Sequence, residues 1–139
     1  MLNSQTSLVG HTGLALAALV DGPENGVPVL LAHGGGQTKR AWKRVCTLLA
    51  AHGFRAVALD LRVHGESDWA ADGAYDVADF ARDLICVAGS FERKPALIGA
   101  SLGGLSGITA EGALAPGSFA SLTLVDVAPQ RPFRKGLSG

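Results

Sequence analysis

The chain has 139 residues, enough for one domain. Hydrophobic residues make up 47% of it, charged residues only 17%, and the formal net charge is zero. No basic stripe and no charge run occurs, which argues against nucleic-acid binding and against a disordered tail. The apolar runs are too short to span a bilayer, and residues 1–10 lack the features of a secretory signal. We therefore expect a cytoplasmic protein without nucleic-acid or membrane partners.

The predicted elements alternate between strands and helices. The strands are expected at residues 14–19, 27–32, 54–61, 95–98 and 122–128, and the helices at 38–52, 76–88 and 102–112. All strands but the first are continuous apolar runs, which is typical of strands buried on both faces of a parallel sheet. Residues 14–19 predict an antiparallel strand at the sheet edge.

Helix boundaries follow from capping residues. Thr38 can cap the first helix, and Gly53 can end it. Asp76 and Asp79 lie in the first turn of the second helix, where negative charge favours the helix dipole. The alternation of strands and helices indicates an α/β fold with a mostly parallel sheet flanked by helices. We assign residues 1–129 to one domain and residues 130–139 to an atypical basic tail.

The pentapeptide at residues 99–103 has the pattern G-x-S-x-G, with Ser101 at its centre. An apolar strand precedes it and a predicted helix follows it, which is the setting of a nucleophilic serine on a sharp strand-to-helix turn. Glycines on either side let the backbone turn without a Cβ clash. The hydroxyl then lies at the helix N-terminus, where unpaired N–H groups favour negative charge.

A second glycine-rich segment, His33 to Gly36, follows the strand at residues 27–32. Alone it predicts only a tight turn. Together with Ser101 it predicts an oxyanion hole, in which the N–H groups of Gly35 and Leu102 bind a substrate oxygen. We expect Gly34 and Gly36 to contact the substrate as well.

A third segment, Asp60 to Ser67, reads D-x-R-x-H-G-x-S, and Leu124 to Pro129 reads L-V-D-V-A-P. These motifs and their order resemble the N-terminal half of the α/β-hydrolase fold family, over nearly the whole chain. Val63 stands where the family commonly has glycine, so a positive φ there would strain this β-branched residue. The resemblance implies that His64 orders the loop and is not a catalytic base.

The resemblance also implies the machinery of a serine hydrolase. Ser101 would attack an acyl carbonyl, a histidine would take its proton, and an acidic residue would orient that histidine. In the family the acid and the histidine follow the serine. No histidine follows Ser101 in this sequence. Asp126 is the one candidate acid, and we interpret it as a structural residue at a strand end more readily than as a triad member.

The family sheet continues past the fourth apolar run, through a lid and further strands, so the sequence looks like a truncated α/β hydrolase. A fragment, an early stop codon and a frameshift would all give a sequence of this kind, and the sequence alone does not distinguish them. Residues 122–125 would then form an open apolar edge, which predicts self-association or marginal stability.

Three functions are weighed. The first is a serine hydrolase of carboxylic esters or lactones, without metal or cofactor and weakly active or inactive as this chain; a cofactor-free haloperoxidase stays open beside it. The second is a non-catalytic binding module or pseudoenzyme. The third is a dinucleotide-binding unit, which the residues contradict, because the sixth position counted from Gly34 in G-x-G-x-x-G is Lys39.

Overall fold

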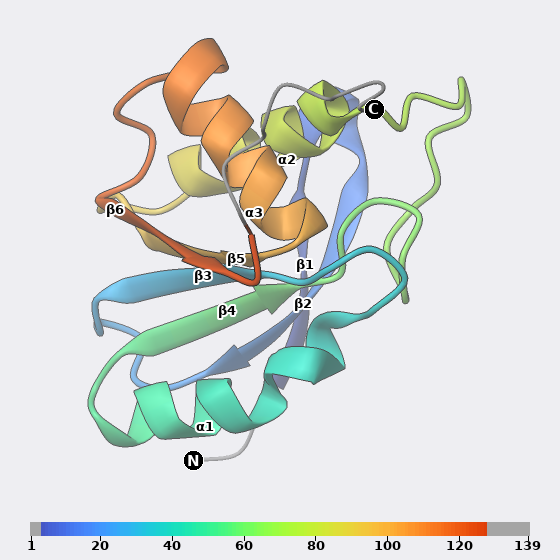
Figure 1. The fold of residues 1–139 in the computed structure, drawn as a ribbon. Coiled ribbons are helices and arrows are strands. Elements are labelled where there is room, and N and C mark those ends of the chain that lie inside the picture. Colours follow the sequence, from blue (N-terminus) through green and yellow to red (C-terminus); the bar gives the residue numbers. More distant parts are fainter. Residues whose placement is uncertain (1–3, 128–139) are drawn as a thin grey trace.

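The computed structural model describes residues 4–127, and the expected tail at residues 130–139 lies outside this range. One mixed sheet forms the centre, with α1 on one face and α2 and α3 on the other (Figure 1). The strands are β1 (Ser4–Val9), β2 (Ala15–Asp21), β3 (Pro28–Ala32), β4 (Arg55–Leu59), β5 (Ala96–Ala100) and β6 (Ser121–Val125). The helices are α1 (Lys43–Ala51), α2 (Val77–Gly89) and α3 (Leu102–Thr109), and a π-helical turn, Ala110–Leu114, extends α3.

The strand order is β1-β2-β4-β3-β5-β6. The pairs β4–β3, β3–β5 and β5–β6 are parallel, whereas β1–β2 and β2–β4 are antiparallel. The prediction of a mostly parallel sheet flanked by helices is therefore confirmed. The prediction that residues 14–19 form the edge was wrong, because β1 pairs with β2 and is itself the edge. Its sequence, Ser-Gln-Thr-Ser-Leu-Val, is too polar to stand out as a strand.

Alternate residues of the inner strands fill two separate cores. Toward α2 and α3, the sheet buries Leu30, Leu59 and Leu97. Toward α1, it buries Leu31 and Ala58, together with residues of α1 and the turn before it. Burying one such leucine side chain contributes about 1.5–3 kcal/mol. Because both faces are covered here, the inner strands read as continuous apolar runs in the sequence.

The first predicted helix begins differently from the prediction. Thr38 does act as a cap, since its hydroxyl oxygen accepts a hydrogen bond from the N–H of Arg40 at 3.3 Å. A 3-10 turn, Lys39–Trp42, follows, and the α-helix begins only at Lys43. The second helix begins at Val77, one residue later than predicted, because Asp76 is its N-cap; the Asp79 carboxylate, in the first turn as predicted, accepts from the Asp76 N–H at 3.0 Å.

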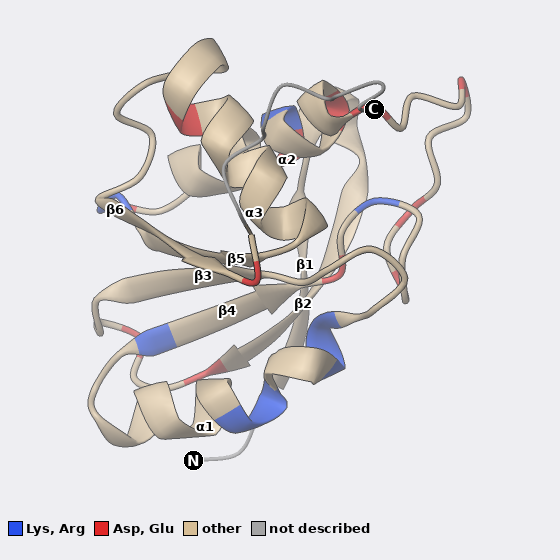
Figure 2. Cartoon of the chain, viewed as in Figure 1, with Lys and Arg blue, Asp and Glu red and all other residues tan. Residues whose placement is uncertain are grey.

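Charged residues are spread over the molecule, with positive and negative residues on several elements (Figure 2). Within residues 4–127, no helix has the length and apolar character that crossing a bilayer requires.

Candidate functional site

Ser101 occupies a sharp turn between β5 and α3. Its backbone has φ 50° and ψ −113°, in a region that residues other than glycine rarely adopt. The Ser101 N–H donates to the carbonyl of Val125 at 3.3 Å, and the Ser101 carbonyl accepts from Leu105 at 2.9 Å. The residue itself is exposed. The turn therefore displays a serine hydroxyl at the N-terminal end of α3.

Two glycines let α3 begin this close to the sheet. A Cβ on Gly99 would lie 2.7 Å from the backbone of Gly103, and a Cβ on Gly103 would overlap the carbonyl of Ala32. The Gly103 N–H donates to the His33 carbonyl at 3.1 Å, which ties α3 to the end of β3. Both glycines of the pentapeptide are thus required by close backbone packing.

The glycine turn after β3 lies beside this serine. A Cβ on Gly34 would lie 3.3 Å from Cβ of Ser101, and one on Gly35 would contact the side chain of Leu102 at 3.9 Å. The sequence-predicted residues Gly34, Gly35, Ser101 and Leu102 are therefore brought together at the carboxyl ends of β3 and β5. Ligands of open α/β sheets bind at this end of the strands.

Hydrogen bonds decide which N–H groups of the turn are available. The Gly34 N–H donates to Oε1 of Gln37 at 3.0 Å, and the Gly36 N–H donates to Nε2 of His64 at 3.0 Å. For the N–H groups of Gly35 and Leu102, residues 4–127 provide no acceptor. The two N–H groups left unpaired are the two that the sequence predicts as oxyanion donors.

The contacts expected between the substrate and both Gly34 and Gly36 stay predictions. With their N–H groups engaged, these residues cannot donate a backbone hydrogen bond to a substrate. Gln37 was missed in the sequence, although a polar residue three positions after Gly34 is well placed to close a turn.

Two histidines hold the loops together. His64 donates from Nδ1 to the Arg62 carbonyl at 2.9 Å while Nε2 accepts from Gly36, so it orders the loop as the resemblance implied. The buried His33 donates from Nδ1 to the Gly34 carbonyl at 2.7 Å and accepts at Nε2 from the Leu61 N–H at 3.0 Å. Burial lowers the pKa of His33 and favours its neutral form. Neither imidazole has a free nitrogen for proton transfer.

A cluster of the buried Lys39 and Asp60 with the exposed Glu66 joins the segments after β3 and β4. The Lys39 ammonium donates to Oδ2 of Asp60 at 2.8 Å and to Oε1 of Glu66 at 2.7 Å. Burial alone would raise the pKa of Asp60, but bonds from the Glu66 N–H and from Lys39 outweigh it and hold this pKa below its ordinary value. Burial opposes the charge of Lys39, yet the two carboxylates raise its pKa. Nothing in the local sequence signals that Lys39 is buried.

The loop after β4 is fixed from its other side by Arg62. Its guanidinium donates to both carboxylate oxygens of Asp83, at 2.7 and 2.8 Å, and to the Ala74 carbonyl at 2.7 Å. Hydrogen bonding to Asp83 is the main cause that raises the pKa of Arg62. The next residue, Val63, has φ 66°. This β-branched residue therefore adopts the positive φ for which the family commonly has glycine at this position.

Asp126 directly follows β6 and is exposed, with φ 54°. The bond from the Ser101 N–H to the Val125 carbonyl brings the ends of β5 and β6 together. Within the described residues, the Asp126 carboxylate has no hydrogen bond to a histidine. Its role as a catalytic acid therefore stays a prediction.

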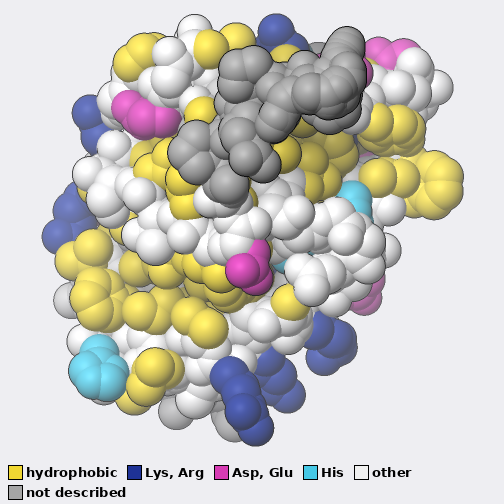
Figure 3. Space-filling model, viewed as in Figure 1, with side chains coloured by type: hydrophobic (Ala, Val, Ile, Leu, Met, Phe, Trp, Pro, Cys, Tyr) yellow, Lys and Arg dark blue, Asp and Glu magenta, His cyan; other side chains and the backbone are white. Residues whose placement is uncertain are grey.

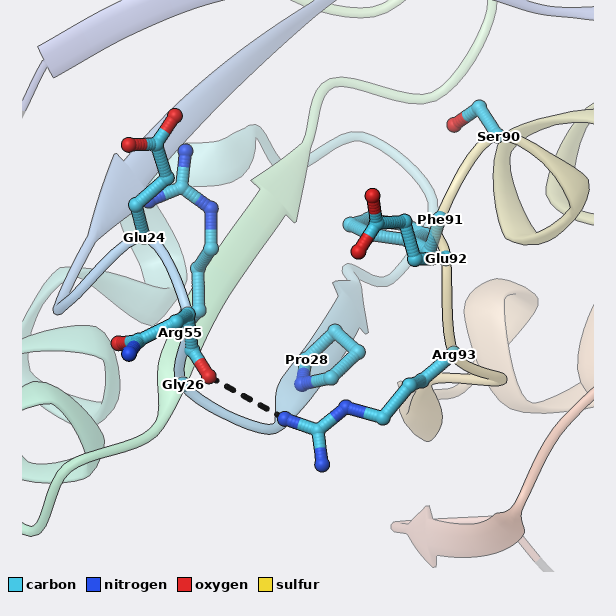
Figure 4. Close-up of a pocket in the computed structure, with 9 residues that line it drawn as sticks. Glu24, Gly26, Pro28, Arg55, Ser90, Phe91, Glu92 and Arg93 are labelled. Atoms are coloured by element: carbon cyan, nitrogen blue, oxygen red, sulfur yellow. Dashed lines mark hydrogen bonds between the residues drawn. The ribbon is translucent and has the colours of Figure 1, made fainter.

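A hollow of about 790 Å³ lies at the opposite end of the sheet (Figure 4). Residues that precede or begin β3, β4 and β5 line it, among them Glu24, Arg55, Glu92 and Arg93. Arg93 donates to the Asn25 carbonyl at 3.2 Å. Because parallel strands end at the other side, this hollow is remote from Ser101. Its charges are balanced, and it is not the candidate active site.

Comparisons with known proteins identify the family to which this fold belongs. A model of the alpha/beta hydrolase family matches residues 29–138. A non-heme chloroperoxidase of Streptomyces lividans is 31% identical over 109 residues, which are 78% of this chain and 39% of the relative. An esterase of Mycobacterium tuberculosis is 38% identical over 104 residues, 73% of this chain and 33% of the relative.

Solved structures give the same result. Epoxide hydrolase A of Mycobacterium thermoresistibile superposes with a TM-score of 0.85 and 26% identity, over 99% of this chain and 44% of that one. A thioesterase domain from the curacin biosynthetic pathway superposes with a TM-score of 0.84 and 26% identity, over 99% of this chain and 51% of that one. The chain thus spans about half or less of the proteins that it resembles. The chain belongs to the alpha/beta hydrolase family.

Proposed function

We propose that this chain carries the nucleophile and the oxyanion hole of a hydrolase that acts on carboxylic esters or lactones. The proposal depends on one observation: Ser101 is exposed on a strained turn beside the N–H groups of Gly35 and Leu102, for which residues 4–127 provide no acceptor. Hydrogen-bond donors held in place before the reaction stabilise the charge that develops in acyl transfer. An esterase among the relatives is in keeping with this reaction class.

In the proposed reaction, Oγ of Ser101 forms a bond to the acyl carbon while its proton passes to a base. The carbonyl oxygen becomes an oxyanion and accepts hydrogen bonds from Gly35 and Leu102. The oxyanion then collapses, the alcohol leaves with a proton, and water hydrolyses the acyl-enzyme. Lactones follow the same steps, with the alcohol remaining attached to the acyl group.

The base is the missing component. No histidine follows Ser101 in the sequence, and both nitrogens of His33 and of His64 are engaged. We therefore propose that the 139-residue chain reacts slowly by itself. Oxyanion donors alone still leave catalysis of roughly 10³–10⁴ over water in serine proteases that lack triad members.

The identity of the nucleophile favours esters over epoxides. Several similar proteins are named epoxide hydrolases. The family resemblance implies an aspartate nucleophile for the epoxide hydrolases of this fold. Position 101 is a serine, and a serine alkoxide is suited to acyl carbonyls.

A fluorophosphonate probe tests the proposal, because it forms a bond with a nucleophilic serine and mimics the tetrahedral oxyanion. We expect slow labelling at Ser101, identified by peptide mass, and acceleration by added imidazole as an external base. Ser101→Ala should abolish labelling, whereas Ser90→Ala, at the exposed end of α2, should leave it unchanged.

Two outcomes would contradict the proposal. A folded chain that is not labelled at Ser101, even with imidazole, would favour the non-catalytic binding module. Fast labelling without imidazole would support the serine nucleophile but show that a base is already present.

A further inference from the structure

The N–H of Gly35 lies in a loop whose neighbouring N–H groups are both held by side chains. The Gly34 N–H donates to Oε1 of Gln37 at 3.0 Å, and the Gly36 N–H donates to Nε2 of His64 at 3.0 Å. The Gly35 N–H itself has no acceptor within residues 4–127. The peptides on either side of Gly35 therefore decide where this N–H points.

The carbonyl of Gly34 sets the direction of the Gly35 N–H. Both groups belong to one planar trans peptide, so they point in opposite directions. The carbonyl accepts from the Gln37 N–H at 3.1 Å and from Nδ1 of the buried His33 at 2.7 Å. Gly36 has φ 79°, as the third residue of a type II turn requires. The turn thus holds the Gly35 N–H on the side away from His33.

The side chain of Gln37 holds the preceding peptide as well. The His33 carbonyl accepts from the Gly103 N–H at 3.1 Å, while the Gly34 N–H at the other end of that peptide donates to Gln37. Gly34 is buried, so without Gln37 its N–H would be left without an acceptor unless the peptide rotated. Gln37 therefore binds Gly34 through both of its backbone polar groups.

Gln37 also lies beside the candidate nucleophile. Oε1 of Gln37 is 2.9 Å from the point that a Cβ on Gly34 would occupy, and Cβ of Ser101 is 3.3 Å from the same point. Gln37 is exposed, and it comes from the loop after β3, whereas Ser101 follows β5. A shift of the Gln37 side chain would consequently be felt at the position where an acyl group meets Ser101.

We propose that Gln37 is a positioning residue of the oxyanion hole, which acts through Gly34 to hold the Gly35 N–H in place for the developing oxyanion. This inference rests on the proposed hydrolase reaction. Donors stabilise a developing charge most when they are fixed before the reaction begins. Gln37 supplies that fixation without itself touching a reacting atom.

An uncharged acceptor suits this position. In the view of Figure 3, the surface over the loop that follows β3 is mostly white, the colour of backbone and of uncharged polar side chains. Because the Gly34 N–H requires an acceptor, the amide of Gln37 faces it with Oε1. A carboxylate could accept the same bond, but it would add a negative charge beside the site where the oxyanion forms.

The rate of fluorophosphonate labelling at Ser101, with imidazole as external base, tests the proposal. Gln37→Met keeps the length of the side chain and removes the acceptor. We expect labelling to slow at least about tenfold, but less than the roughly 10²–10³-fold that loss of a whole oxyanion donor costs. Gln5→Met, the same change at an exposed position of the edge strand β1, should leave the rate unchanged.

A double-mutant cycle shows whether Gln37 acts through the Gly35 N–H. Gly35→Pro removes that N–H, and proline is common before the positive-φ residue of a type II turn. It should slow labelling roughly 10²–10³-fold. Adding Gln37→Met in this background should change the rate less than about twofold, because the group that Gln37 positions is already gone. A further tenfold loss would overturn the proposal.

The outcomes separate this inference from the proposed function. A wild-type chain that is not labelled at Ser101 would overturn both. A wild-type chain that is labelled, with Gln37→Met labelled equally fast, would overturn this inference alone. Urea unfolding of each variant verifies that the chain is folded.

Amide hydrogen exchange tests the underlying contact independently of labelling. The Gly34 N–H should be protected in the wild-type chain, lose protection in Gln37→Met and keep it in Gln37→Glu, whose carboxylate still accepts. Rapid exchange of Gly34 in the wild-type chain, or equal protection in Gln37→Met, would overturn the proposal whatever the labelling rates.

Discussion

Ser101 and Val63 are two of the four residues other than glycine that have a positive φ in the described part of the chain. Ser101, between β5 and α3, has φ 50°, and Val63, in the loop after β4, has φ 66°. For residues other than glycine, such conformations cost of order 1–3 kcal/mol each and persist only where the surroundings fix them. At Ser101 the conformation exposes a hydroxyl; at Val63 no comparable chemical group is displayed.

The surroundings that fix the two turns differ in kind. Backbone packing fixes Ser101, through Gly99, Gly103 and the carbonyl of Val125. Charged groups fix the Val63 loop, through the pair of Arg62 with Asp83 and the cluster around Asp60. We therefore expect substitutions of charged residues and changes of pH to loosen the Val63 loop, and only changes of shape to loosen the serine turn.

Arg62→Met should have the largest effect on the Val63 loop. It leaves the buried Asp83 carboxylate without its charged partner and with only the His11 N–H bonded to it at 2.9 Å, and breaking a buried ion pair typically costs roughly 3–5 kcal/mol. Urea unfolding measures the loss. Arg44→Met, which removes an exposed arginine from α1, should change the free energy of unfolding by less than about 0.5 kcal/mol. Equal effects of the two substitutions would mean that the ion pair does not fix the loop.

Gly103→Ala should break the serine turn through shape alone. The added methyl group overlaps the Ala32 carbonyl, so α3 has to move away from β3, at a cost of about 3 kcal/mol. Gly112→Ala adds the same group where no atom lies within 4 Å, and it should change stability by less than about 1 kcal/mol. Labelling of Ser101 should fall in the first variant and persist in the second.

The serine turn could be predicted from sequence because its determinants are local. An apolar strand, the pattern G-x-S-x-G and a following helix occupy consecutive residues around Ser101. The glycine turn at residues 34–36 is equally local, and the motif raised the condition that a positive φ at Val63 would be strained, which the observed φ of 66° meets. The parallel sheet followed from strands that are apolar on both faces.

The remaining parts depend on contacts between distant segments. His64 reaches Gly36 across 28 residues of sequence, and Lys39 reaches Asp60 across 21. These contacts arise only once β3 and β4 lie side by side, so no local pattern announces them. β1 was not predicted because its sequence is polar. It becomes a strand by antiparallel pairing with β2 along its whole length, and its own hydrophobicity does not signal it.

Acid should lower the free energy of unfolding in two pH ranges, one set by His33 and one by Asp60. His33, whose pKa burial lowers, is neutral when folded, so stability falls as pH decreases below about 6.5, the ordinary histidine value. Asp60 has a lowered pKa, so its contribution is complete above about 4, the ordinary aspartate value, and is lost as pH falls through its folded value. Amide hydrogen exchange should show the Glu66 N–H, bonded to Asp60, losing protection before the Gly103 N–H. Simultaneous loss would mean that both turns belong to one cooperative unit.

Val63→Gly should have the smallest effect and the opposite sign. Glycine adopts φ 66° without strain, and the relief should exceed the roughly 0.5–1 kcal/mol that glycine costs in conformational entropy. We expect the free energy of unfolding to rise by about 1 kcal/mol in urea titrations. Val9→Gly, at an exposed position of β1 outside the positive-φ region, should lower it instead. If both substitutions destabilise the chain alike, Val63 stores no strain, and of the two turns compared only the serine turn, which displays a reactive group, would carry a conformational cost.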